Sequence, residues 1–442
     1  MKLHRQVLLP VLVAYVAVPL FAQSQLRVGA AKVSITPPES FFPYPQADRG
    51  FVDVHDPIYA RAIVVDDGSS QVATVAIDFR HVPHNTDLPK AISEATGIPA
   101  DHIMVYATHD HDTPRLDNPT QEGEAEPKFS EWINLVQKGA VEATQRAKAV
   151  LQPARIGYGT GKAYVNVNRD QQMATGLWDI GFNPDRPSDK TVAVIRFEKP
   201  TGELIAVYAN YAVHGVVMYE SVTKGKGWQV SGDLPGNTSR YVEEHYGNGV
   251  VALFTSGAAG DQEPVYMSVY NQLQPDAHDE GAAGWAILDV QARRLGEEIV
   301  RVNEAIKPES TPVRVWAAKS APTCPGQRIA YDKAAGQYTV TPLPPLAIPL
   351  SMIVIGNIAI GGVAGEPVSI IGQHFKQASP LPNTIIVNHA GPTIAYIPDD
   401  ASYPLRTFEV RGSRLKEGCS EPAIINGLVE LIKKSSADRA SK

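Results

Sequence analysis

Two histidines separated by a single residue follow an apolar stretch in the first third of the chain. The segment Met104–Arg115 reads MVYATHDHDTPR, so an apolar, partly β-branched run leads into His109 and His111. In an extended backbone, side chains two residues apart point to the same side. We therefore expect both imidazoles to face one point just beyond the end of a strand, where paired histidines favour a metal site.

Other polar residues follow further predicted strands. They are Asp78, Arg80, His214, Asp261, Glu263, Glu366, Asn388 and Tyr396. Parallel strands would bring all of these residues to one edge of a sheet. Two imidazoles and a carboxylate form a common catalytic zinc site, and nitrogen and oxygen ligands suit Zn²⁺.

Several of these residues also have simpler explanations. His214 could be a hydrogen-bonded histidine of the core, and Glu366 could be an acid favoured by the dipole of a helix N-terminus. Tyr396 could serve packing alone, and Asp261 could cap a turn. Their convergence at strand ends is what favours a functional site.

Strand and helix patterns alternate along the chain. Apolar runs predict strands at 59–65, 71–79, 102–107, 191–197, 204–213, 250–254, 353–360 and 384–387. Helical spacing predicts helices at 87–96, 129–147, 234–246, 286–306, 367–375 and 421–434. This alternation is typical of the α/β class, and we expect a layered α/β/α sheet with the metal site at the strand carboxyl ends. The Pro-rich segment 308–350 is poor in strand signals.

The N-terminus has the features of a secretory signal peptide. A basic start precedes the apolar stretch Val7–Leu20, and Ala22 offers a small residue for cleavage. We expect residues 1–22 to be removed, leaving 23–442 as a single catalytic domain that is secreted or periplasmic and has no stable membrane span. A retained membrane anchor is the alternative.

Composition narrows the classes of partner. The chain has 442 residues and a formal net charge of -7, without the basic surface that nucleic-acid binding requires. It has two cysteines, Cys324 and Cys419, which are not spaced as metal ligands. Export would permit a disulfide between them, but the sequence does not show that they meet.

An ordered set of motifs resembles the N-terminal catalytic domain of the neutral/alkaline (non-lysosomal) ceramidase family. The matching segments are Val28–Pro37 (VGAAKVSITP), His55–Ala62 (HDPIYARA), Ala107–His111 (ATHDH), Asn168-Arg169, Asn210–His214 (NYAVH), Val230–Gly236 (VSGDLPG), Ala259–Asp261 (AGD), Gly365–Pro367 (GEP) and Tyr396–Pro398 (YIP). The resemblance covers roughly residues 27–412, and it implies a zinc-dependent hydrolase.

The resemblance also implies a role for each matching residue. It implies that the zinc ligands are His109, His214, Glu366 and Tyr396. His111 and Arg169 would contact the substrate near the reacting carbonyl, and Asp261 would belong to the catalytic group. This differs from the reading of the histidine pair alone, in which His109 and His111 could both bind the metal.

The chain departs from the family pattern in two places. Ceramide-cleaving members read Gly-Asp-Val-Ser-Pro with an essential serine, whereas this chain reads GDQEP at Gly260–Pro264, with Glu263 in place of the serine. We hypothesise that Glu263 is a general base, the alternative being an exposed acid of a displaced loop. The chain also ends without the short alternating strands of an immunoglobulin-like C-terminal domain. Ser256 lacks the Gly-x-Ser-x-Gly elbow of a serine hydrolase.

Three functions fit these observations. The first is an exported zinc-dependent hydrolase that cleaves an amide or ester bond of a small or lipid-like N-acyl substrate. The second is a true ceramidase that releases a sphingoid base and a fatty acid. The third is a non-catalytic or carbohydrate-directed member that keeps the scaffold.

Overall fold

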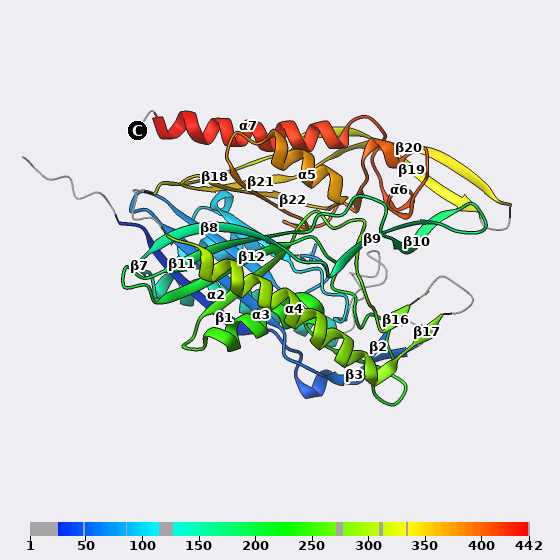
Figure 1. The fold of residues 1–442 in the computed structure, drawn as a ribbon, viewed down its shortest axis with the longest axis horizontal. Helices are drawn as coiled ribbons and strands as arrows, with labels where there is room; N and C mark the ends of the chain where they lie inside the picture. The colour runs from blue at the N-terminus through cyan, green and yellow to red at the C-terminus, as the bar shows by residue number, and fades with distance from the viewer. Residues whose placement is uncertain are drawn as a thin grey trace, which may run out of the picture.

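Three sheets, each covered by helices on one face, share a central core (Figure 1). The computed structural model describes residues 25–46, 49–84, 86–114, 127–270, 277–308, 313–332 and 335–440. The predicted signal peptide, residues 1–22, lies outside these residues. Within them, no helix has the length and apolar character needed to cross a membrane.

The first sheet has the order β6-β5-β4-β1-β7. Its strands are β1 (Arg27–Ser34), β4 (Tyr59–Asp66), β5 (Gln71–Ile77), β6 (Ile103–Ala107) and β7 (Gln152–Pro153). Helices α1 (Leu88–Thr96) and α2 (Pro127–Ala149) cover it. The buried residues Phe129, Trp132, Val136, Ala140 and Ala143 recur at helical spacing, so α2 presents one continuous apolar face to the sheet.

The second sheet has the order β14-β12-β11-β8 and is covered by α3 and α4. Its elements are β8 (Arg155–Lys162), β11 (Thr191–Glu198), β12 (Leu204–Tyr211), α3 (Asp233–Tyr246), β14 (Val251–Ser256) and α4 (Gly284–Ala305). The third sheet has the order β18-β21-β22-β24, and α5 and α7 lie over it (Figure 1). Its elements are β18 (Val315–Ser320), β21 (Leu350–Ile355), β22 (Ile358–Val363), α5 (Ser369–Ala378), β24 (Asn383–Val387) and α7 (Ser420–Ala440).

Short elements complete the described chain. The strands are β2 (Tyr44–Gln46), β3 (Arg49–Val54), β9 (Asn166–Gln172), β10 (Trp178–Asn183), β13 (Trp228–Val230), β15 (Gln262–Pro264), β16 (Val269–Tyr270), β17 (His278–Asp279), β19 (Thr323–Asp332), β20 (Gln337–Ala347), β23 (Glu366–Pro367) and β25 (Tyr396–Ile397). The helices are η1 (Glu39–Phe41), η2 (Ala100–His102), η4 (Gly281–Ala283), η5 (Asp400–Ser402) and α6 (Phe408–Gly412). The β19–β20 hairpin projects from one end of the molecule (Figure 1).

Each of the three sheets contains one parallel pair of strands, and the carboxyl ends of these pairs meet. The pairs are β5 with β6, β12 with β14, and β22 with β24. The amide of Asn388, just after β24, donates to the carbonyl of Ser256 at the end of β14. The amide of Ala107, at the end of β6, donates to the carbonyl of His389. The three strand-end regions therefore lie side by side.

The structure confirms alternating helices and strands and a site at strand carboxyl ends, but it corrects the sheet arrangement. We expected one layered sheet whose parallel strands form a single edge. The sheets are instead mixed, with antiparallel pairs such as β1–β4 and β11–β12 beside each parallel pair. The site is therefore built from three separate parallel pairs.

Two predicted segments are also corrected. The apolar run 353–360 is two antiparallel strands, β21 and β22, because Gly356 adopts φ 61° and turns the chain between them. Segment 308–350, expected to be poor in strands, contains β18, β19 and β20. Cys324 and Cys419, for which pairing was left open, form a disulfide.

A buried ion triad supports the strand ends beside the site. Nη1 of Arg61 on β4 lies 2.7 Å from Oδ2 of Asp78, and its Nε lies 2.9 Å from Oε1 of Glu243 on α3. All three side chains are buried. Asp78, one of the polar residues predicted to gather at strand ends, thus joins β4 to the turn after β5.

Replacing Arg61 with Met should destabilise the protein strongly. The change leaves the carboxylate of Asp78 buried without its cation, and Glu243 keeps only its pair with Lys32. Removing one partner of a buried ion pair typically costs about 3–5 kcal/mol. Urea unfolding would measure the loss. Arg293→Met removes an exposed pair with Glu297 and should leave the unfolding midpoint unchanged. Equal midpoints for the two variants would contradict the role given to the triad.

Candidate metal centre

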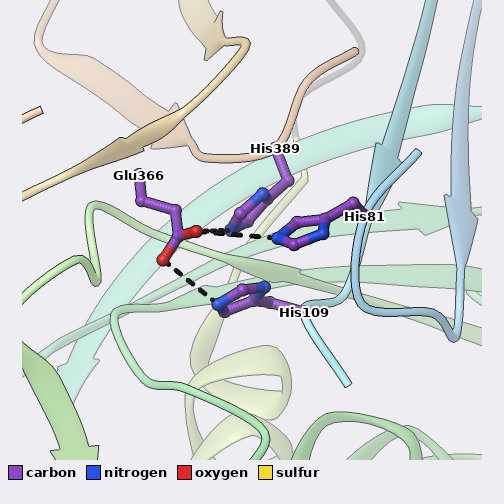
Figure 2. A group of neighbouring side chains, drawn as sticks. All are labelled: His81, His109, Glu366 and His389. Atoms are coloured by element: carbon purple, nitrogen blue, oxygen red, sulfur yellow. Dashed lines mark ion pairs between the residues drawn. The ribbon is translucent and has the colours of Figure 1, made fainter. Parts of the chain in front are cut away.

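One carboxylate and four imidazoles converge where the parallel pairs end. Oε2 of Glu366 lies 3.3 Å from Nε2 of His109 and 3.5 Å from Nε2 of His214. Oε1 of the same carboxylate lies 3.6 Å from Nε2 of His81 and 3.9 Å from Nε2 of His389. Figure 2 shows the side chains of His81, His109 and His389 pointing toward Glu366. Two overlapping groups of side chains could each hold a metal ion: His81, His109, Glu366 and His389 form one, and His109, His111 and His214 form the other.

His109 and His389 occupy equivalent positions after two strands. Each is the second residue beyond its strand, β6 or β24. Both adopt a left-handed backbone, with φ values of 63° and 49°. Such a conformation costs a residue other than glycine about 1–3 kcal/mol, and it clusters at functional sites. The turns that carry these histidines are therefore shaped for the position of the imidazoles.

Backbone carbonyls fix the orientation of two rings. Nδ1 of His109 lies 2.9 Å from the carbonyl oxygen of Arg80, and Nδ1 of His214 lies 3.0 Å from that of Gln262. A carbonyl only accepts hydrogen bonds, so both Nδ1 atoms carry the proton and both Nε2 atoms present lone pairs to Glu366. Outer hydrogen bonds of this kind orient metal-binding histidines.

Burial keeps three imidazoles of the site, those of His109, His111 and His389, in the neutral form. It lowers the pKa of His109 to about 3, and it lowers the pKa values of His111 and His389 well below the usual range. Neutral imidazole is the form that binds a metal. Both ring nitrogens of His389 and Oε2 of Glu366 are buried and make no hydrogen bond among the described residues. Unpartnered nitrogen and oxygen atoms that converge in this way fit a bound cation.

His111 lies beside His109, although not for the predicted reason. Because His109 is left-handed, the chain is not extended beyond Ala107, and the alternation expected of a strand does not apply. Instead, the amide of His111 donates to the carbonyl of Gly215, which brings its Nε2 to 3.1 Å from Nε2 of His109. His111 also lines the neighbouring cavity.

The backbone of Tyr396 pairs directly with that of Glu366. The two residues are partners in the parallel β23–β25 bridge. The Tyr396 ring contacts both the guanidinium of Arg169, 5.3 Å from the ring centroid, and the ring of Phe408. Tyr396 lines the cavity, so it is not a residue of the core alone. Glu366 itself precedes α5 by three residues, so the helix-terminus explanation of its acid is wrong.

Arg169 links the histidine cluster to two buried carboxylates. Its Nη1 lies 2.7 Å from Oε1 of Glu263 and 3.4 Å from Nε2 of His214. Its Nε lies 2.7 Å from Oε1 of Glu409. Burial acts to lower the pKa of Arg169, but Tyr396 and Glu409 raise it well above its ordinary value. Arg169 therefore remains a cation.

Glu263 is buried on the short strand β15, so the exposed-loop alternative is wrong. Arg169 holds its Oε1, while its Oε2 is buried without a hydrogen-bond partner in the described part of the chain. Glu263 lines the same cavity as His111 and Arg169. A carboxylate with one oxygen anchored and one free is suited to exchanging a proton with a bound molecule.

The carboxylate of Asp261 is engaged in supporting the fold. Asn168 donates to its Oδ2 over 2.7 Å, and the amide of Ser369, the first residue of α5, donates to its Oδ1 over 2.7 Å. Burial raises the pKa of Asp261 to about 6. Asp261 is not among the residues that line the cavity. These contacts indicate that Asp261 positions Asn168 and the first residue of α5. This role resembles the alternative explanation of Asp261 as a residue that caps a turn.

A cavity of about 680 Å³ adjoins the cluster. Its polar lining residues are Arg80, His111, Arg169, Gln171, Gln172, Glu220 and Glu263. Its remaining wall is largely apolar, including Met173, Ile180, Phe182, Val216, Tyr266, Met267 and Phe408. A pocket that combines apolar walls with convergent polar groups can hold a small molecule that has both apolar and polar parts.

Sequence reasoning missed three residues of this site. His81 follows β5 and His389 follows β24, so the strand-end rule could have included both. Asn388, which was selected, is the neighbour of His389. Glu409 lies on the short helix α6, and no sequence pattern connects it with Arg169.

Comparisons with known proteins agree with this arrangement. Residues 27–277, more than half of the chain, match the family model described as neutral/alkaline non-lysosomal ceramidase, N-terminal. A neutral ceramidase of Pseudomonas aeruginosa is 26% identical over 261 residues, which are 54% of this chain and 37% of that relative. The matched region thus spans little more than a third of the relative's length.

Two solved structures share the fold. One is described as a ceramidase complexed with C2; it has a TM-score of 0.71 and 17% identity and covers 93% of this chain and 76% of its own. The other is neutral ceramidase from Pseudomonas aeruginosa, with a TM-score of 0.69, 18% identity and coverage of 92% and 74%. The family model matches the chain from β1 to beyond β15. This chain therefore belongs to the neutral/alkaline non-lysosomal ceramidase family.

Proposed function

We propose that the chain is an exported, zinc-dependent hydrolase that cleaves the amide or ester bond of an N-acyl compound. The observation that carries this proposal is the position of Glu263. It lines the cavity together with His111 and Arg169, and Arg169 connects it to the histidine cluster. Family membership supports an amidohydrolase, and the name of the bacterial relative supports a lipid amide as substrate.

The metal would be held by His109, His214, Glu366 and Tyr396. The first three present converging nitrogen and oxygen atoms, and Tyr396 is joined to Glu366 by backbone pairing. Zinc bound there would polarise the substrate carbonyl and lower the pKa of a water ligand toward ~7.

Side chains of the cavity would carry the proton transfers. Oε2 of Glu263 would take a proton from the attacking water, whose oxygen forms the new bond to the carbonyl carbon. When the carbon–nitrogen bond breaks, Glu263 would return that proton to the leaving nitrogen. His111 and Arg169 would donate hydrogen bonds to the developing oxyanion. Asp261 would position this group by holding Asn168, the neighbour of Arg169.

The cavity wall supports an apolar acyl group as part of the substrate. Three aromatic side chains of the wall remain open to solvent, Tyr266 at 67%, Phe182 at 51% and Tyr270 at 42% of their full exposure. Exposed aromatic residues beside a concave surface provide contact area for an apolar ligand. A small or lipid-like N-acyl compound would satisfy both the apolar wall and the polar end.

Acyl release should depend on a metal ion. We expect protein loaded with Zn²⁺ to release the acyl group from a short-chain fluorescent ceramide or from a smaller N-acyl amide, and a chelator to abolish release until Zn²⁺ is restored. His374→Ala, at an exposed histidine paired with Glu421, should behave as wild type. Acyl release from the ceramide would identify a true ceramidase. Acyl release from the smaller amide alone would exclude a true ceramidase. Release that a chelator does not affect would contradict the proposal.

Glu263→Gln should lower turnover by roughly 10²–10⁴-fold, because the amide keeps the shape but cannot accept the proton. Zinc content should stay at the wild-type level, since Glu263 is not a proposed ligand. Glu203→Gln, at an exposed acid, serves as the control. Turnover within a few-fold of wild type, in a variant whose thermal unfolding is normal, would remove Glu263 from the mechanism.

Export predicts a shortened chain. If residues 1–22 are a signal peptide, the protein recovered from the periplasm or the medium should begin at Gln23. Intact mass and N-terminal sequencing would show this directly. A full-length chain confined to the cell interior would contradict export without affecting the proposed reaction.

A further inference from the structure

The two oxygens of Glu366 face different pairs of histidines. Oε2 faces His109 and His214, at 3.3 and 3.5 Å, whereas Oε1 faces His81 and His389, at 3.6 and 3.9 Å. Figure 2 shows this division for three of the histidines: one oxygen is directed at His109 and the other at His81 and His389. One carboxylate thus presents a separate oxygen to each pair.

The number of donors exceeds what one zinc ion uses. With Tyr396, the proposed metal site already has four ligands, the usual number for zinc. His81 and His389 are additional and lie on the opposite oxygen of Glu366. A histidine whose only role is to orient a ligand donates a hydrogen bond to it, but neither ring nitrogen of His389 makes a hydrogen bond among the described residues.

The ring of His389 is held in a fixed orientation. It stacks on the ring of His109, with centroids 3.9 Å apart and planes inclined by 21°. Its side chain is fully buried, and its backbone is left-handed. A polar ring buried without a partner is costly, so this arrangement calls for a ligand on the nitrogen that faces Glu366.

His81 connects the Oε1 side of Glu366 with solvent. Its side chain retains 30% of its full exposure, whereas those of His109, His214 and His389 are buried. An ion bound by His81, His389 and Oε1 of Glu366 would have three protein ligands. Three ligands with an open position are typical of catalytic rather than structural zinc sites.

We propose that this cluster holds two divalent metal ions bridged by the carboxylate of Glu366. The first ion is bound by His109, His214, Tyr396 and Oε2 of Glu366. The second is bound by His81, His389 and Oε1 of Glu366. The second site goes beyond the proposed function, which requires only the first. The nitrogen and oxygen donors suit zinc-like ions in both positions.

Metal content tests the proposal independently of any reaction. The full chain, saturated with Zn²⁺ and freed of excess by desalting, should contain two zinc ions per chain by inductively coupled plasma mass spectrometry. His81→Ala and His389→Ala should each contain one. His374→Ala, an exposed histidine away from the cluster, should retain two. His81 is partly exposed, so its variant tests the site even if His389→Ala does not fold.

One zinc ion per wild-type chain at saturation would overturn the proposal, and so would two ions in both His81→Ala and His389→Ala. Cobalt(II) gives a second readout, since two ions bridged by one carboxylate should show magnetic coupling that His81→Ala abolishes. Uncoupled cobalt in a wild-type chain with two ions would refute the bridge. If the wild-type chain binds one zinc ion and hydrolyses the substrate, the proposed function stands and the second site is refuted. If the chain binds two zinc ions but does not hydrolyse the substrate, the second site stands and the proposed function is refuted.

Discussion

A buried carboxylate surrounded by lone pairs is the constraint on which the rest of the site depends. Glu366 faces the Nε2 atoms of His109 and His214, and the carbonyls behind these rings keep their protons on Nδ1. Acceptors packed this closely repel one another unless a cation lies between them. The fold therefore has to hold an unfavourable arrangement of acceptors in place.

Three parallel strand pairs provide the necessary rigidity. A parallel pair ends with two neighbouring chains pointing the same way, so the residues after it are delivered to one place. In this protein each sheet contributes one such pair, and hydrogen bonds from Asn388 to Ser256 and from Ala107 to His389 fasten the ends together. The left-handed turns at His109 and His389 can persist because both neighbouring strands are fixed.

The sequence allowed prediction of the residues that follow strong strands, because apolar runs and their ends are local patterns. His109, His214 and Glu366 were found in this way. The mixed sheets could not be predicted, since antiparallel neighbours such as β1 and β4 are set by long-range pairing. The run 353–360 concealed a turn at Gly356 because both strands are apolar throughout. Glu409 reaches Arg169 only through tertiary packing, 240 residues away.

The glutamate at position 263 is electrostatically coupled to Arg169. A buried carboxylate requires a counter-charge, and Nη1 of Arg169 supplies it while also lying near His214. A serine at this position, as the family resemblance implies, would carry no charge and would leave Arg169 paired with Glu409 alone. Position 263 therefore cannot change between serine and glutamate without altering the charge balance beside the histidine cluster. For this reason the chemistry of Glu263 has to be considered together with Arg169 and Glu409 as one unit.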